Sequence, residues 1–321
     1  MKRGEATLRY LLAPIQAALD DPDTREIVVN KPGRFGVENS QGWQWHDAPE
    51  LTFGRCDAIA TLAAHAISQD FGPSRPAGSS RLPNGERITM ARPPMMPPEV
   101  VSLTIRKRAK SFTPTLKWKQ DRGYFSFLPQ DRDWAAWMEE QVANKRTFLL
   151  TGETGSSKST LAEALIRAIP EDERIVTLES TPEWTDLPHE NWIPLLYSPE
   201  GQETGYRSAA ECLEITLRQR PDRILFGEMR TGEAWAYLRA LMAGHPGGIT
   251  TAHADEGTPP SEEPAFDAIS QMIRQNDSAR GMSNAELHAL LRKHVHVICH
   301  CRKVKDDPIP YRVSSVTEVR A

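Results

Sequence analysis

Residues 151–160 read T-G-E-T-G-S-S-K-S-T and lie between a short apolar run and an amphipathic segment. The apolar run, residues 147–150, is typical of a buried strand, and apolar residues recur with helical spacing from Leu161 to Ile169. A glycine-rich loop between a strand and a helix is the setting in which backbone N–H groups cradle phosphate. We therefore expect this stretch to bind the phosphates of a nucleotide.

Individual positions of this loop have expected roles. Lys158 should contact the β- and γ-phosphates, and the Ser159 hydroxyl should coordinate Mg²⁺. The backbone N–H groups of residues 153–158 should point at phosphate oxygens. The full set of expected nucleotide contacts in this stretch is Gly152, Glu153, Thr154, Gly155, Ser156, Ser157, Lys158, Ser159 and Thr160.

One position departs from the general phosphate-loop pattern, which has glycine immediately before the lysine. That position is Ser157 in this chain. Glycine is used where the backbone approaches a ligand closely or adopts a strained conformation, and a serine Cβ crowds that space. Ser157 therefore puts the rate of turnover in question more than binding. The alternative, a glycine-serine turn before an ordinary helix, leaves the Lys158-Ser159 pair unexplained.

Composition limits the classes of function. The 321 residues suggest about two domains, and a hydrophobic content of 39% is enough to form their cores. A net charge of −4 offers no broad basic field for sequence-independent binding of nucleic acid. No apolar run reaches the ~18 residues that would suggest a membrane-spanning helix, and the N-terminal stretch lacks a signal-peptide pattern. We expect a cytoplasmic protein, and a peripheral position on a membrane assembly is compatible with this composition.

The cluster H-V-H-V-I-C-H-C at 294–301 first suggests a metal site. Alternation along a strand places Val295, Val297, Cys299 and Cys301 on one face and the three histidines on the other. Ligands divided between two faces do not easily converge on one tetrahedral ion, so a buried strand is favoured over a zinc site.

The first domain is expected to be a smaller α+β domain, residues 1–106, with an antiparallel sheet. Residues 107–133 are basic, contain two prolines and lack a sustained period, which predicts a linker with one short helix. The second domain is expected to span residues 134–321. Within the first domain we expect helices at 8–19 and 54–70, strands at 26–29, 35–38 and 100–105, a strand around Trp43 and Trp45, and a hairpin at Asn84-Gly85.

Strands and helices alternate in the second domain, which predicts an α/β fold with a mainly parallel sheet. In such a sheet, ligands bind outside the carboxyl ends of the strands. Glu179, Glu228 and His253 each follow a predicted strand at that edge, as the phosphate loop does. The expected strands after the loop are 175–178, 223–226 and 248–253, and the expected helices are 209–218 and 234–243.

These strand-end residues have candidate roles in hydrolysis. Glu228 is expected to polarise the attacking water, because a carboxylate beside the γ-phosphate can accept its proton. His253 is expected to sense the γ-phosphate or to link it to the neighbouring strand, and a packed histidine is the alternative. Because Gly227 stands where aspartate is usual, Mg²⁺ would depend on Ser159, with Glu179 contributing through water. The candidates for stabilising the transition state with positive charge are Arg207, Arg218, Arg220 and Arg230.

Four ordered segments resemble motifs of the type II and type IV secretion ATPases, in which they are called Walker A, Asp-box, Walker B and His-box. Three further segments resemble the N-terminal domain of the type IV secretion, or conjugation, traffic-ATPase branch. The four motifs are residues 151–160, R-I-V-T-L-E-S-T-P-E at 174–183, R-P-D-R-I-L-F-G-E-M-R at 220–230 and G-H-P-G-G-I-T-T-A-H-A at 244–254. The three N-terminal segments are E-I-V-V-N-K-P-G at 26–33, L-P-N-G-E-R-I-T-M at 82–90 and S-L-T-I-R-K at 102–107.

The resemblance implies a RecA-like P-loop ATPase domain, an N-terminal domain over the nucleotide, and a homo-hexameric ring that uses ATP and Mg²⁺. It implies a place at the cytoplasmic face of the inner membrane beside other subunits of a type IV secretion machine. The implied work is pilus assembly or substrate export, in conjugative DNA transfer or effector secretion. Arg106 matches the arginine that reaches the nucleotide from the N-terminal domain in this family. Gly227 is usual in the family, whereas Ser157 and Ser180 depart from its pattern.

Three functions compete at this point. The first is a ring ATPase that converts hydrolysis into motion between its two domains. The second is a nucleotide-binding structural subunit with little or no hydrolysis, which Ser157 and Ser180 favour. The third is a small-molecule kinase or a nucleic-acid motor. The sequence shows no acceptor-pocket motif for a kinase and no sign of the basic groove that a nucleic-acid motor would need.

Overall fold

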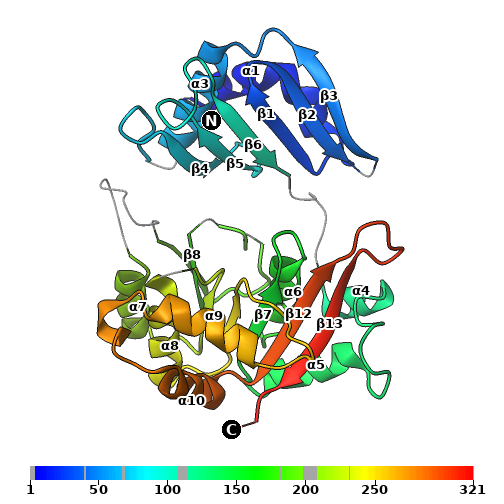
Figure 1. The fold of residues 1–321 in the computed structure, drawn as a ribbon, viewed down its shortest axis with the longest axis vertical. Coiled ribbons are helices and arrows are strands. Elements are labelled where there is room, and N and C mark those ends of the chain that lie inside the picture. The colour runs from blue at the N-terminus through cyan, green and yellow to red at the C-terminus, as the bar shows by residue number, and fades with distance from the viewer. Residues whose placement is uncertain are drawn as a thin grey trace. The chain divides into compact units, whose positions relative to one another are not determined.

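The computed structural model describes residues 4–39, 41–66, 69–107, 114–180, 182–184, 186–197, 208–230 and 232–320. The described residues up to 107 form one compact unit, and those from 114 onward form a second. Figure 1 shows the elements of each unit. Arg207, one of the candidate arginines, lies outside the described residues.

The described residues of the first unit form a six-stranded antiparallel sheet with the order β3-β2-β1-β6-β5-β4. The predicted hairpin at Asn84-Gly85 is confirmed, since β4 and β5 flank it and pair in antiparallel register. The strands are β1 (Glu26–Lys31), β2 (Gly33–Asn39), β3 (Gly42–Ala48), β4 (Ala77–Arg81), β5 (Arg87–Ala91) and β6 (Ser102–Arg106).

Helices α1 (Glu5–Leu12), α2 (Gln16–Asp20) and α3 (Phe53–His65) supply apolar residues to the core of this unit. The single helix predicted at 8–19 is divided, because Pro14 lies in a 3₁₀ turn between α1 and α2 and has no N–H to continue the α-helical ladder. Helix α3 ends earlier than predicted. Fully buried side chains of the core include Ile15, Ile27, Ile59, Ile88 and Ile105.

The second unit contains the predicted parallel sheet. Its described strands form two groups, with the orders β10-β8-β9 and β11-β7-β12-β13. All neighbours in these groups are parallel except β12 and β13, which are antiparallel. A bridge between Met229 and Ala252 joins the ends of β10 and β11. The strands are β7 (Phe148–Gly152), β8 (Ile175–Glu179), β9 (Trp192–Leu196), β10 (Arg223–Phe226), β11 (Ile249–Thr251), β12 (Val297–Lys303) and β13 (Tyr311–Glu318).

Helices cover both faces of this sheet (Figure 1). Side chains alternate along β7, so that Leu149 enters one apolar core while Phe148 and Leu150 enter the other. Helices α4 (Leu116–Asp121), α5 (Trp134–Ala143) and α6 (Lys158–Ile166) pack in the core of Phe148 and Leu150. The core of Leu149 contains α7 (Ala209–Arg218), α8 (Gly232–Met242), α9 (Glu263–Ile273) and α10 (Asn284–His294).

Two regions differ from the sequence-based expectations. The described part of the predicted linker, residues 114–133, buries Leu116, Phe125 and Leu128 in the core of the second unit. The predicted strand at 294–301 begins later, because α10 extends to His294 and β12 begins at Val297.

Among the described residues, no helix combines the length and apolar character needed to cross a bilayer.

A buried ion pair connects the start of β10 with the turn that precedes β8 in the second unit. The Arg223 side chain is fully buried at the start of β10, and its Nε and Nη2 atoms each donate to a Glu173 carboxylate oxygen at 2.8 Å. Arg223 also donates to the carbonyl of Val142 at 2.8 Å. Burial raises the pKa of Glu173, but Arg223 and Lys145 together hold it below its ordinary value. The carboxylate is therefore the folded-state form near neutral pH.

Replacing Glu173 with glutamine should lower the free energy of unfolding by about 3 kcal/mol, because it leaves the buried Arg223 cation without its counter-ion. The carboxylate's contribution is present above the ordinary glutamate pKa of about 4.3 and is lost as the pH falls through its lower folded-state value. Chemical denaturation of wild type and Glu173→Gln at pH 7 and in acid measures both effects. The exposed neighbour variant Glu171→Gln is the control, and an equal loss in that variant would contradict the assignment.

Candidate active site

The phosphate loop begins where β7 lies against β12. Gly152 ends β7 with a φ of +132°, and a Cβ built there would lie 2.1 Å from the carbonyl oxygen of Cys301. Two constraints therefore require glycine at this position: the backbone conformation and the contact with the neighbouring strand. This contact sets the direction in which the chain leaves the sheet.

Lys158 is the first residue of α6, and its side chain folds back over the loop. Its ammonium donates to the carbonyl oxygens of Gly152 at 2.8 Å and Glu153 at 2.7 Å. The side chain is buried, whereas Ser159 in the first helical turn is exposed. A helix N-terminus, loop N–H groups and a lysine ammonium together form a cradle whose charge fits phosphate, and the exposed hydroxyl fits an oxygen ligand for Mg²⁺.

The remaining loop positions differ in exposure. Glu153 and Thr154 are exposed, Ser156 is buried, and Thr160 is half-buried in the first turn of α6. Gly155 has a φ of +75° with open space where a Cβ would lie. Its glycine is therefore required by the backbone conformation alone.

Ser157 adopts the left-handed conformation that the general pattern assigns to glycine. Its φ is +75° and its ψ is +22°. A residue with a Cβ pays roughly 1–2 kcal/mol for this conformation. Serine at this position therefore carries backbone strain that glycine would not.

Glu228 lies just beyond β10, and two side chains contact its carboxylate. His253, just beyond β11, places Nε2 2.9 Å from Oε1, and Arg230 donates to Oε2 from Nε at 3.0 Å and Nη2 at 2.9 Å. The two strand ends are joined by the Thr251 hydroxyl, which donates to the carbonyl of Gly227 at 2.9 Å. The structure thus brings together Glu228 and His253, and of the three candidate arginines that it describes, it places Arg230 at this carboxylate.

Glu179 ends β8 and is buried. Its Oε1 accepts backbone N–H bonds from Glu183 at 2.7 Å and Trp184 at 3.2 Å, so one oxygen holds the loop that follows. A Cβ at Gly227 would lie 3.1 Å from the Glu179 Cγ atom. The glycine before Glu228 therefore leaves room for Glu179 on the adjacent strand.

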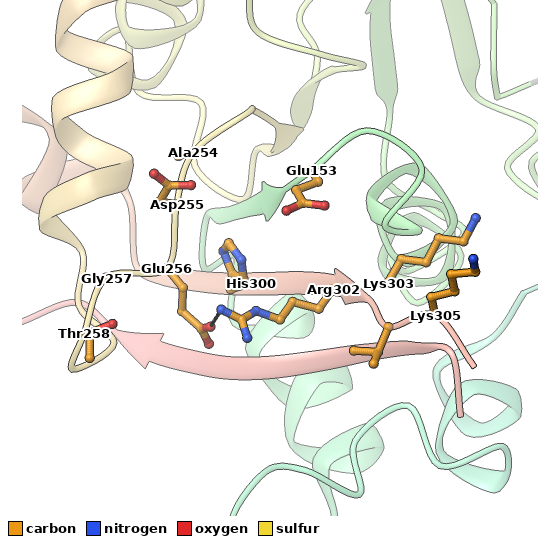
Figure 2. A pocket seen from close by; sticks show the side chains of 11 residues that line it. Glu153, Ala254, Asp255, Glu256, Gly257, Thr258, His300, Arg302, Lys303 and Lys305 are labelled. Atoms are coloured by element: carbon orange, nitrogen blue, oxygen red, sulfur yellow. Dashed lines mark ion pairs between the residues drawn. The ribbon is translucent and has the colours of Figure 1, made fainter. Parts of the chain in front are cut away.

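A cavity of about 720 Å³ lies on the β12 side of the phosphate loop. Glu153 lines it from the loop, and His300 lines it from β12 (Figure 2). His300 Nδ1 lies 2.9 Å from the Thr151 hydroxyl, and burial lowers the pKa of His300. Arg302 pairs with Glu256 across the cavity at 3.2 Å. The alternating pattern of residues 294–301 did not predict that His300 lines this cavity or that it contacts Thr151 on β7.

Other predicted residues are farther from this constellation or in the other unit. Arg106 ends β6 in the first unit and is exposed, and its contact with nucleotide stays a prediction. Arg218 ends α7, and Arg220 lies in the following turn with a φ of +52°. In the cluster at 294–301, Cys299 and Cys301 are buried in the core. Among the described residues, no group of three or more His, Cys, Asp or Glu side chains is arranged to hold a metal ion.

One residue near the loop was missed by the sequence analysis. Lys119 lies on α4, within the segment predicted as a linker, and its side chain is completely buried. Its Nζ atom lies 3.4 Å from the Ser157 hydroxyl oxygen. No periodic signal in that segment distinguishes Lys119 from its exposed neighbour Lys117.

Comparisons with known proteins identify a matching family and similar structures. A family model described as type II/IV secretion system protein matches residues 73–305. Protein VirB11 of Rhizobium radiobacter is 36% identical over 318 residues, covering 93% of this chain and 91% of that protein. A similar solved structure is the crystal structure of the VirB11 ATPase from the Brucella suis type IV secretion system in complex with sulphate. Its sequence is 32% identical, the TM-score is 0.52, and the match covers 98% of this chain and 95% of that chain. The X-ray structure of the Legionella pneumophila ATPase DotB shows likeness of fold alone, because its sequence is only 16% identical. The TM-score is 0.63, over 92% of this chain and 76% of that one.

The two loop glycines should respond differently to alanine. Gly155→Ala should lower the free energy of unfolding by about 1–2 kcal/mol, because only the positive φ is strained. Gly152→Ala should cost at least about 2 kcal/mol more, because the new Cβ also overlaps the Cys301 carbonyl. Chemical denaturation of the two variants measures the difference, and equal losses would show that β12 yields freely at this contact.

Proposed function

This chain belongs to the type II/IV secretion system protein family, and we propose that it is an ATP hydrolase that powers type IV secretion. The observation that carries hydrolysis is the Glu228 carboxylate, which His253 and Arg230 contact at the same sheet edge as the phosphate loop. A carboxylate fixed in this way can orient a water molecule and accept its proton. His253 and Arg230 limit the orientations that Glu228 adopts.

The loop residues supply the proposed nucleotide contacts. Lys158 exchanges its two carbonyl partners for β- and γ-phosphate oxygens, and the backbone N–H groups of residues 153–158 surround the phosphates. Ser159 and Glu179, the latter through water, would hold Mg²⁺, which would neutralise phosphate charge when bound. His253 is placed to report the state of the γ-phosphate to Glu228.

The proposed assembly is a homo-hexamer that couples hydrolysis to movement between the two units of each chain. Arg106 from the first unit would reach the nucleotide, which is the contact that makes the position of that unit depend on bound phosphate. The proposed location is cytoplasmic, at the inner-membrane face of a type IV secretion machine and in contact with its other subunits. Its work there is pilus biogenesis or substrate export, in conjugation or effector secretion.

A second candidate function is a nucleotide-binding structural subunit that hydrolyses ATP weakly or not at all. The strained backbone of Ser157 favours it, because strain in the loop weakens the transition-state contacts that require exact placement. Ser180, where the family commonly has aspartate, removes a carboxylate beside Glu179 and favours it too. Rates of hydrolysis separate the two functions.

Replacing Glu228 with glutamine should lower kcat for ATP hydrolysis by at least about 100-fold, because the amide does not accept the proton of the attacking water. Affinity for ADP should change little, since Glu228 lies at the γ-phosphate end of the proposed site. Steady-state phosphate release and calorimetric ADP binding measure the two quantities. Glu139→Gln, an exposed carboxylate on α5, is the control. Wild-type and Glu228→Gln rates that both equal the background would favour the structural subunit.

The assembled particle should have the mass of six chains. Multi-angle light scattering of the full chain, with and without ATP and Mg²⁺, measures that mass directly. A ring is expected because the resemblance to the secretion ATPases implies a homo-hexamer. A monomer under all of these conditions would contradict the hexameric motor while leaving nucleotide binding intact.

A further inference from the structure

Lys119 is an unusual residue for the interior of this unit. Lysine is almost never fully buried without a partner, yet the Lys119 side chain is 0% exposed. Its ammonium lies 3.8 Å from the centroid of the Tyr124 ring, which is a cation–π contact, and it donates to the Ser157 hydroxyl at 3.4 Å. The partners of this buried charge are therefore an aromatic face and one side chain of the phosphate loop.

Ser157 is the residue of the loop whose conformation needs support. It holds the left-handed conformation at a φ of +75°, which a residue with a Cβ adopts at a cost. Burial raises the pKa of the Tyr124 hydroxyl, and the nearby Ser157 side chain opposes that rise. The hydroxyl that distinguishes Ser157 from glycine is the oxygen to which Lys119 donates.

We propose that Lys119, packed on the Tyr124 ring, is a positioning residue for the phosphate loop, which holds the Ser157 hydroxyl and thereby the left-handed backbone at that position. This inference rests on the proposed function, because the loop matters here as the binder of nucleotide. A glycine at 157 adopts the same conformation without support and offers Lys119 no oxygen. Lys119 should therefore matter to nucleotide affinity when residue 157 is serine and matter little when it is glycine.

The charge of Lys119 provides a second readout. Burial lowers the pKa of Lys119 to about 7, while Cys301 on β12 and Glu163 on α6 oppose this effect. Lys158 on α6 acts on the same Cys301 thiol, and Tyr124 faces the ammonium from its own segment. A neutral amine is a weaker donor than an ammonium. Support of Ser157 should therefore weaken as the pH rises through this value.

The experiment is a double-mutant cycle on ADP binding to the full chain, measured by calorimetry at pH 6.5. Lys119→Met should weaken ADP binding about tenfold when residue 157 is serine, as expected for the loss of a hydrogen bond from a charged donor. In the Ser157→Gly background the same change should alter affinity by less than about twofold. Lys117→Met, two positions away on α4 and paired with Asp121 at the surface, is the matched control and should leave affinity unchanged.

Two further measurements keep the test decisive. Ser157→Ala keeps the Cβ and removes only the hydroxyl that accepts from Lys119, so it should weaken ADP binding relative to both serine and glycine at 157. This comparison remains decisive should Lys119→Met fail to fold. Between pH 6 and 8, the affinity difference between wild type and Lys119→Met should shrink, and no such change should occur in the Ser157→Gly background.

The outcomes separate this inference from the proposed function. Equal weakening by Lys119→Met in both backgrounds would overturn it, because the lysine would then act on nucleotide other than through Ser157. An unchanged affinity in the serine background would also overturn it. Absence of ADP binding by the folded wild-type chain would instead overturn the proposed function.

Discussion

The contact between the Gly152 backbone and the Cys301 carbonyl is the constraint on which the loop geometry depends. It holds the end of β7 against β12 and leaves no room for a side chain at the point where the chain leaves the sheet. From there the loop turns under the Lys158 ammonium, which joins the first two loop carbonyls to the start of α6. The loop is thus held at both ends by contacts within the chain.

The sheet edge that carries Glu228 depends on a second set of short links between strands. The Thr251 hydroxyl ties β11 to the Gly227 carbonyl, and this bond brings His253 beside Glu228. Neither link requires an unusual residue, because parallel neighbours place their carboxyl ends together. The contacts with His253 and Arg230 give the half-buried Glu228 carboxylate a defined direction.

Much of this arrangement was predictable from sequence because local patterns specify it. The strand–loop–helix unit around Lys158, the parallel sheet and the strand-end position of Glu228 follow from apolar runs and their polar ends. Helix α10 overran the predicted strand because a capping box at Ser283 fixes its start and helical packing carries it to His294. Lys119 was not predictable, since its burial depends on tertiary packing of a segment without periodicity. The partly exposed strand β9 gave too weak an alternation to be recognised.

The narrow space between Gly227 and Glu179 limits what can be engineered at this edge. An aspartate grafted at 227 would press its first side-chain carbon against the glutamate stem on the adjacent strand. It would also set two carboxylates side by side in a buried place, where like charges oppose joint ionisation. The fold therefore accommodates either a glutamate at position 179 or an aspartate at position 227. Introducing the commoner aspartate at 227 would require replacing Glu179 at the same time.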